Sequence, residues 1–298
     1  MSKAYTLGGN ACTINNLICA YTDPYNPLDL PLNIIRVRTR DGLAPRKVSD
    51  TTYETATQVP GTTDVYDVYK SGTDFTNLLH DSNNVAEVLG ANTKHITDMT
   101  QMFENCTSLS SVVLFDTSHV SSTRFMFAST NITEVPLYNT SNVSLIDGMF
   151  WSCISLPTIP VLDTSNAIDM GGMFGRCHSL TSVPLLNTSN VTSMAGMFYE
   201  SYSISSVPLF DTHNVIDMNS MFNMFGQQQS NPALTAIPLF DTSNVTGMSL
   251  AFYDCINVQT GAYDLYYQAS TQANPPRDYA QAFHNCGDSD RIPSEWKD

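Results

Sequence analysis

The chain has 298 residues, a formal net charge of −15 at pH 7 and a sequence pI of about 4.5. Such an acidic surface disfavours binding to nucleic acids and to anionic membranes, because both carry dense negative charge. No apolar run approaches the roughly 20 residues of a membrane-spanning helix, so we expect no membrane insertion.

The N-terminal segment, residues 1–70, lacks the repeat that dominates the rest of the chain. Its start, MSKAYTLGGNACTINNLICAYT, has no apolar stretch of the signal-peptide type, so we expect no export by a cleaved signal. The sequence IRVRTR at 35–40 alternates like a half-exposed strand, and the Asp-Gly pair after it is typical of a hairpin turn. With further strands over 53–59 and 64–69, the segment is predicted to be a small β domain that attaches the protein to its assembly.

Charge is spread unevenly along the chain. Residues 1–60 hold six Lys/Arg and five Asp/Glu, a net charge of about +1, whereas the remainder holds seven against 23, a net charge of −16. A cluster of cations lies in this first segment: Arg36, Arg38, Arg40, Arg46 and Lys47. One interpretation is a docking patch for an acidic partner, such as the array of a neighbouring copy; the other is the solvated face of a strand.

The rest of the chain repeats one unit, (D/N)TSNVxxMxxMFxxCxxLxx(V/I)P. Its first position falls, at spacings of 24, 23, 24, 24, 24 and 30 residues, on Asn92, Asp116, Asn139, Asp163, Asn187, Asp211 and Asp241. A fixed period of this length is typical of a solenoid, in which each turn packs only on its neighbours. We therefore predict a mainly β, leucine-rich-repeat-like solenoid with short helical turns over residues 71–257, including an atypical N-terminal capping turn.

The turn over residues 180–200 illustrates the local structure that we expect. Its pattern predicts a short strand at 180–185, a polar corner at 187–190, a second strand at 191–194 and a helical turn at 196–200. The Met, Phe and aliphatic positions of a single turn cannot form a core alone. Stacked turns must therefore bury them in one continuous core.

The polar corner is expected to be structural. Its fourth position is Asn at 142, 166, 190, 214 and 244, and His at 95 and 119. A stacked row of these side chains can satisfy backbone groups of the corner and of the next turn. The first position alternates between Asp and Asn from 116 to 211, which relieves repulsion between like charges roughly 5 Å apart and argues against a calcium ladder.

Five of the seven cysteines occupy one repeat position, three residues after the Phe: Cys106, Cys153, Cys177, Cys255 and Cys286. Cysteines on successive turns point the same way, which is poor geometry for a disulfide, and a ladder does not converge on a metal. We predict reduced core thiols made in a reducing compartment. No nucleophile elbow, P-loop, HExxH, dinucleotide-binding or CxxC motif is present, so we predict no catalytic residue, metal or cofactor.

Two irregularities interrupt the array. Six residues are inserted in the sixth turn, where the candidate binding loop consists of Gln227, Gln228, Gln229, Ser230 and Asn231. Solenoids accommodate insertions on one face, often the binding face, although a tolerated surface loop is the simpler explanation. From residue 258 the pattern dissolves, and we predict a C-terminal cap over 258–298 that includes a short helix at 261–273.

With these residues in view, the array resembles the BspA-like leucine-rich repeat family of bacterial surface proteins. The resemblance rests on the (D/N)TSNVxxMxxMFxxCxxLxxVP unit and covers roughly residues 73–286. It implies an adhesion and recognition module without enzymatic activity, of a type found in gut bacteria and their phages. One departure is that surface members of the family carry an export signal, which we do not find in this sequence.

Two functional hypotheses follow from the resemblance. The first is a phage virion structural protein, such as a fibre, tail or decoration protein, which is assembled in the host cytoplasm and presents the solenoid to the host surface. The alternative is a bacterial cell-surface adhesin exported by an unusual route; an enzyme acting on polysaccharide comes third. The expected partners are other virion or surface-assembly proteins, a host cell-surface glycan or protein, and further copies of the chain in a homo-oligomer.

Overall fold

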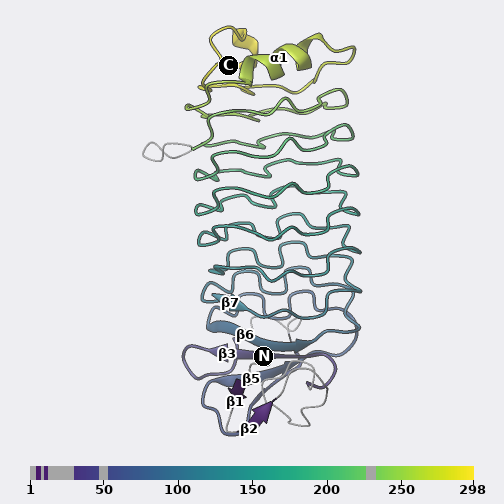
Figure 1. The fold of residues 1–298 in the computed structure, drawn as a ribbon, viewed down its shortest axis with the longest axis vertical. Coiled ribbons are helices and arrows are strands. Elements are labelled where there is room, and N and C mark those ends of the chain that lie inside the picture. The colour runs from purple at the N-terminus through teal and green to yellow at the C-terminus, as the bar shows by residue number, and fades with distance from the viewer. Residues whose placement is uncertain (1–4, 8–9, 13–29, 47–52, 226–232) are drawn as a thin grey trace.

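The computed structural model describes residues 5–7, 10–12, 30–46, 53–225 and 233–298. Within these ranges the chain forms an elongated stack of turns, with a small sheet at one end and the helix α1 (Ala262–Thr271) at the other (Figure 1). The predicted mainly β solenoid is confirmed. No helix in the described ranges is long and apolar enough to cross a membrane.

A five-stranded sheet closes the N-terminal end of the stack, in the order β4-β5-β3-β6-β7. Its strands are β3 Ile34–Thr39, β4 Thr55–Gln58, β5 Val65–Tyr69, β6 Val85–Asn92 and β7 Ser111–Val112. β3 pairs antiparallel with β5 and β6, whereas β6 pairs parallel with β7 of the next turn. β6 is therefore both a strand of the N-terminal sheet and the first edge of the solenoid, and one sheet joins strands from both sides of residue 70.

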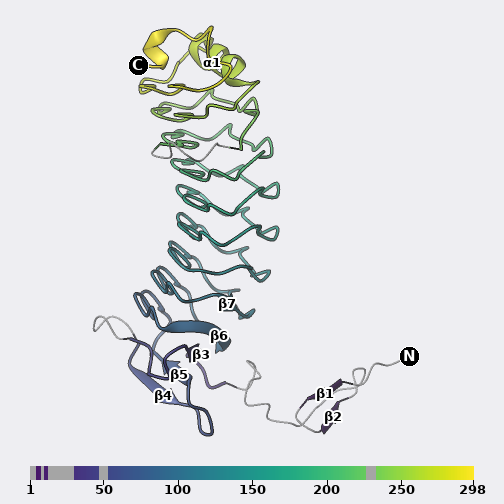
Figure 2. The same ribbon diagram turned by 90° about the vertical axis from the view of Figure 1, so that its left-hand side faces the viewer.

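The strands predicted at 35–40, 53–59 and 64–69 are present as β3, β4 and β5, but the predicted hairpin differs. Gly42 turns the chain with a φ of 69°, yet the strand that returns beside β3 is β5, and β4 pairs with β5. The reason is that β5 and β6 occupy both edges of β3, so β4 has no edge left there. A separate antiparallel pair consists of β1 (Tyr5–Leu7) and β2 (Asn10–Cys12) (Figure 2).

Neighbouring turns of the solenoid meet through single parallel bridges. One row of bridges runs through Asp98, Ser122, Leu145, Asp169, Ser193, Asp217, Gly247 and Asp278. The strand predicted at 191–194 is reduced to its bridge at Ser193, and residues 180–185 form no strand. Pro184 explains the second difference, because proline has no N–H to donate to a neighbouring strand.

The segment after the bridge is a run of tight turns, where the sequence predicts a helical turn at 196–200. The amide of Met197 donates to the Met194 carbonyl within the turn, whereas that of Phe198 donates to Met221 in the next turn. Gly196 has a φ of 62°, a left-handed conformation that ends any continuous right-handed helix. Alternate amides of this segment therefore donate to carbonyls of the neighbouring turn, and the others bond within their own turn.

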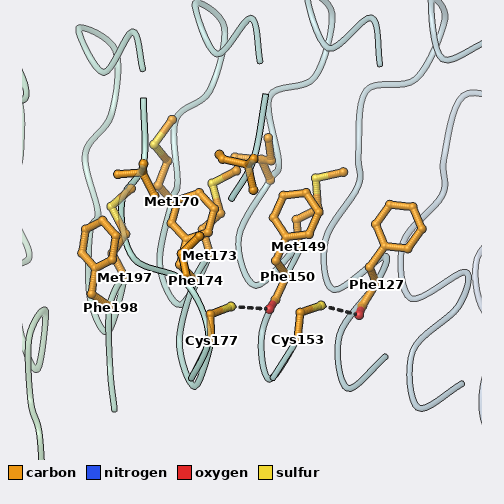
Figure 3. Packing of buried hydrophobic residues seen from close by; sticks show 14 of the residues in the cluster. Phe127, Met149, Phe150, Cys153, Met170, Met173, Phe174, Cys177, Met197 and Phe198 are labelled. Carbon is orange, nitrogen blue, oxygen red and sulfur yellow. Dashed lines mark hydrogen bonds between the residues drawn. The ribbon is translucent and has the colours of Figure 1, made fainter. Parts of the chain in front are cut away.

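A column of phenylalanine rings forms the centre of the core. The stacked neighbours, with ring centroids 5.0–6.0 Å apart, are Phe103, Phe127, Phe150, Phe174, Phe198, Phe222, Phe252 and Phe283. All of these rings are fully buried, and methionines pack beside them (Figure 3). The predicted continuous core is therefore confirmed, with one ring contributed by each turn.

Aromatic side chains close the C-terminal end of the stack. The predicted helix at 261–273 is present as α1, and a 3-10 helix at Ser294–Trp296 follows it. The Trp296 ring stacks on Tyr279 with centroids 4.3 Å apart, and its carbonyl accepts the Phe283 amide at 3.0 Å. Trp296 thus covers the rings of the last turn and accepts one of its amide hydrogen bonds. In the rest of the stack, the following turn has both roles.

Removal of one ring from the column should cost much of the stability of the fold. We expect Phe174→Ala to lower the free energy of unfolding by about 3–5 kcal/mol, because it leaves a cavity between turns. The matched control is Leu185→Ala, at an exposed position of the following turn, which should change it by less than about 0.5 kcal/mol. Chemical denaturation measures both values, and a loss below about 1 kcal/mol for Phe174→Ala would contradict the placement of this ring.

Candidate recognition surface

The first residue of each corner fixes its shape by a side-chain hydrogen bond. The Oδ1 atom of Asp163 accepts the Ser165 amide at 3.0 Å, and that of Asn139 accepts the Ser141 amide at 3.2 Å. The same bond recurs at Asp116, Asn187, Asp211 and Asp241. Asp and Asn are therefore equivalent for the backbone of the corner, because both present an oxygen at this position.

The second and fourth residues of each corner connect it to the turns on either side. The buried Thr164 hydroxyl donates forward to the Asn187 carbonyl at 2.8 Å, and Asn166 Nδ2 donates backward to the Ser141 carbonyl at 2.6 Å. Equivalent Asn bonds occur at Asn142, Asn190, Asn214 and Asn244, which confirms the predicted role of this row. His119 instead contacts the Ser118 hydroxyl of its own turn.

A row of exposed aliphatic side chains runs along the stack just before the corners. This aliphatic ladder, with 54–64% of each residue exposed, consists of Leu114, Leu137, Val161, Leu185, Leu209 and Leu239. The backbone here is extended, so alternate residues face outward: Leu209 is exposed, Phe210 is buried and Asp211 is exposed. The ladder is thus a direct consequence of how Phe210 and its equivalents reach the core.

The first corner residues form a second exposed row beside the aliphatic ladder. This corner row consists of Asp116, Asn139, Asp163, Asn187, Asp211 and Asp241, and the two rows together are called the ladder surface. Hydrogen bonds from Ser118, Ser165 and His213 lower the pKa of the three carboxyls Asp116, Asp163 and Asp211. These carboxylates are therefore ionised at neutral pH.

Each end of the ladder surface opens into a hollow. At the N-terminal end, Leu114 and Leu137 line one together with Lys94 from the turn before. At the C-terminal end, Leu239 and Asp241 line the other with residues of α1, including Asp264 and Tyr267. Between these ends, six aliphatic rungs and six corner-row residues are exposed, so the surface combines apolar side chains with carboxylates.

The predicted docking patch is divided by the structure. Arg36 makes an ion pair with Asp67 at 2.6 Å, and Arg38 makes ion pairs with Asp64 at 3.4 Å and Glu87 at 2.5 Å. Arg40 and Arg46 are exposed. Lys47 lies outside the described residues, as does the predicted loop Gln227, Gln228, Gln229, Ser230 and Asn231.

The cysteines are hydrogen-bond donors as well as core residues. Cys153 Sγ donates to the Phe127 carbonyl at 3.1 Å and Cys177 Sγ to that of Phe150 at 3.1 Å (Figure 3). Where the repeat has Ser201 instead, its hydroxyl donates to the Phe174 carbonyl at 2.6 Å. The five cysteines at this repeat position are free and buried, as predicted, and burial raises the pKa of the Cys153 thiol to about 12.

Two stacked aromatic rings elsewhere on the stack are already covered by an arginine of the same chain. Trp151 and Tyr199 lie with ring centroids 5.8 Å apart, and the Arg176 guanidinium lies over both rings while it pairs with Glu200 at 3.0 Å. Gly175 makes room for this arrangement, because a Cβ there would come within 2.3 Å of the Trp151 ring. Within the described ranges, no group of three or more His, Cys, Asp or Glu side chains is arranged to hold a metal ion.

The aliphatic ladder was not anticipated from the sequence. In the sequence, the aliphatic residue after the proline of each repeat is compatible with a buried position and with an exposed one. The segment around it has no regular hydrophobic period that would distinguish between the two. The signal that identifies it is the next residue, Leu or an aromatic in several turns, such as Phe210 or Tyr138, which is a stronger candidate for the core. In an extended segment the residue before it must then face solvent.

A family model described as "Mycoplasma protein of unknown function, DUF285" matches residues 73–183, 129–235 and 169–289. Among solved structures, a leucine-rich cell surface protein from Faecalibacterium prausnitzii A2-165 is 17% identical over 61% of this chain and 62% of its own, with a TM-score of 0.29. A leucine-rich repeat protein from Bacteroides ovatus ATCC 8483 is 14% identical over 78% and 76%, with a TM-score of 0.36. The chain thus spans less than two thirds of the Faecalibacterium protein. No curated protein matches it.

The buried thiols should resist alkylation until the protein unfolds. A pKa of about 12 leaves a thiolate fraction on the order of 10⁻⁴ at pH 8, and burial excludes the reagent. We expect iodoacetamide at pH 8 to label Cys153 and Cys177 only in denaturant, as mapped by mass spectrometry of their peptides. The control is Leu185→Cys, whose introduced thiol should react in the native protein; equal rates at Cys177, or a Cys153–Cys177 bridge, would refute this prediction.

Proposed function

The chain belongs to the DUF285 family, and from this premise we propose that it is a non-enzymatic recognition protein whose ladder surface docks a partner. The observation that carries the proposal is the aliphatic ladder, in which six successive turns each expose one aliphatic side chain in the same row. Soluble proteins rarely expose contiguous apolar surface of this kind unless it contacts another molecule. The fold does not require these side chains, because the core is filled by their buried neighbours.

Binding accounts for the described residues better than catalysis does. The thiols with strongly raised pKa values are buried between turns, where no substrate reaches them. The carboxylates of the ladder surface have lowered pKa values, which suit charge recognition and are opposite to the raised values that general acids need. A repeated, extended surface is typical of solenoids that recognise other macromolecules.

We further propose that recognition takes place at a bacterial cell surface, with the N-terminal segment on the attachment side. The resemblance of the repeat unit to the BspA-like surface family supports this location. The alternative, a phage virion component, stays a prediction of the sequence. Immunogold labelling separates the two, because an antibody against the chain would decorate intact cells in the first case and purified particles in the second.

The proposed function predicts that adhesion depends on the ladder. A variant with Leu137→Ser, Leu185→Ser and Leu209→Ser, called the ladder variant, should fold normally because these residues are exposed. Beads coated with the wild-type chain should be retained on target cells, and beads coated with the ladder variant should lose at least about 90% of this retention, since the variant removes three of the six exposed aliphatic side chains of the ladder. Equal retention of the two proteins would contradict the proposal.

A further inference from the structure

Resting on the proposed function, we propose that the partner of the ladder surface is a cationic amphipathic protein helix, which lies lengthwise along the aliphatic ladder with its Lys or Arg side chains over the corner row. Three observations carry this inference: the charge of the corner row, the independence of that charge from the fold, and the spacing of the rungs.

No ion pair joins a corner-row carboxylate to Lys or Arg in the described part of the chain; Lys94 acts on Asp116 only at longer range, where its charge helps to lower the pKa of that carboxyl. Four arginines elsewhere in the described chain pair with acids, as in Arg124 with Asp147 at 3.0 Å and Arg176 with Glu200 at 3.0 Å. The carboxylate of Asp211 pairs with His213, at 2.6 Å. Asp211 and Asp241, which lie on neighbouring turns, add to the charge at the C-terminal half.

This charge is not needed by the fold. Asn139 and Asn187 make the same bond to the backbone as Asp163 does, at 3.2, 3.1 and 3.0 Å. Either residue type therefore shapes the corner, and a carboxylate adds only its charge. The charge also borders the aliphatic ladder along its length, so a partner must combine an apolar strip with cationic groups at one side.

Charge complementarity excludes the other occupants of this surface. A second copy docking through its own ladder surface would bring carboxylates against carboxylates, and anionic lipid and nucleic acid are repelled in the same way. A glycan would have to bury hydroxyls against the Leu and Val rungs, whose side chains offer them no hydrogen bond. A basic protein segment with aliphatic side chains complements both rows, because its aliphatic side chains contact the aliphatic ladder and its cations lie over the corner row.

The spacing of the rungs favours a helix that lies along the stack. Turns joined by parallel bridges repeat at about 4.8 Å, and a helix repeats at about 5.4 Å per turn. The difference of about 0.6 Å per turn accumulates to roughly 2 Å over three turns, which flexible Leu and Lys side chains absorb. A strand in the same orientation presents a side chain only every 6.6 Å or so, and loses register within two rungs.

The test uses two synthetic 18-residue amphipathic peptides that share one leucine face, one with Lys and one with Glu on the polar face. Fluorescence anisotropy at 50 mM salt should show the Lys peptide binding the wild-type chain at least about tenfold more tightly than the Glu peptide, and most of this preference should vanish at 500 mM salt. The ladder variant should bind the Lys peptide at least about tenfold more weakly.

A charge variant completes the design. Asp163→Asn with Asp211→Asn keeps both corner bonds and should weaken binding of the Lys peptide at least about fivefold. Its matched control, Asp169→Asn with Asp217→Asn, removes the same charge from the bridge row and should change affinity by less than about twofold.

Three outcomes would overturn the cationic partner: equal effects of the two double substitutions, equal binding of the Lys and Glu peptides, or no binding of the Lys peptide to the wild-type chain. If the ladder variant binds the Lys peptide as tightly as the wild-type chain does, the peptide does not lie on the ladder surface and this inference fails, whereas bead adhesion that still depends on the ladder leaves the proposed function standing.

Discussion

The hydrogen bond between one turn and the next is the interaction on which the rest of the structure depends. No turn satisfies its own backbone: Phe198 donates its amide forward to Met221, Asn166 donates backward to Ser141, and Cys177 donates its thiol backward to Phe150. The Thr and Asn that recur in the corner donate these bonds, and the recurring Phe is a ring of the central column. The exposed rungs of the aliphatic ladder take no part in them and face solvent.

This division explains how one repeat serves both stability and recognition. The corner needs an oxygen at its first position, and Asn139 and Asp163 provide it equally. Charge on the corner row can therefore change without a change of fold, as can the identity of the exposed rung. The N-terminal sheet and Trp296 contribute only at the two ends, where they supply the missing neighbours of the first and last turns.

Much of the fold could be predicted because it repeats. The period, the buried Phe column, the Asn row and the free thiols all follow from what each residue type must do when it recurs on stacked turns. The absence of the strand expected at 180–185 could not be predicted in this way, because it depends on one missing N–H group, that of the proline in an apolar run. The partners of Arg36 and Arg38 also lie far along the chain, on β5 and β6, so their pairing depends on a sheet order that local patterns do not contain.

Because each turn bonds only to the turns beside it, the array has a genetic consequence. Unequal recombination between two repeats removes or adds a whole unit, and the new junction joins surfaces that already match. The turn that starts at Asp116 is one residue shorter than its neighbours, at 23 against 24 residues, and still stacks, so the junction tolerates small errors. A lineage can thus inherit longer or shorter arrays as copy-number variants, and the reach of its contact surface becomes a trait that changes in single steps.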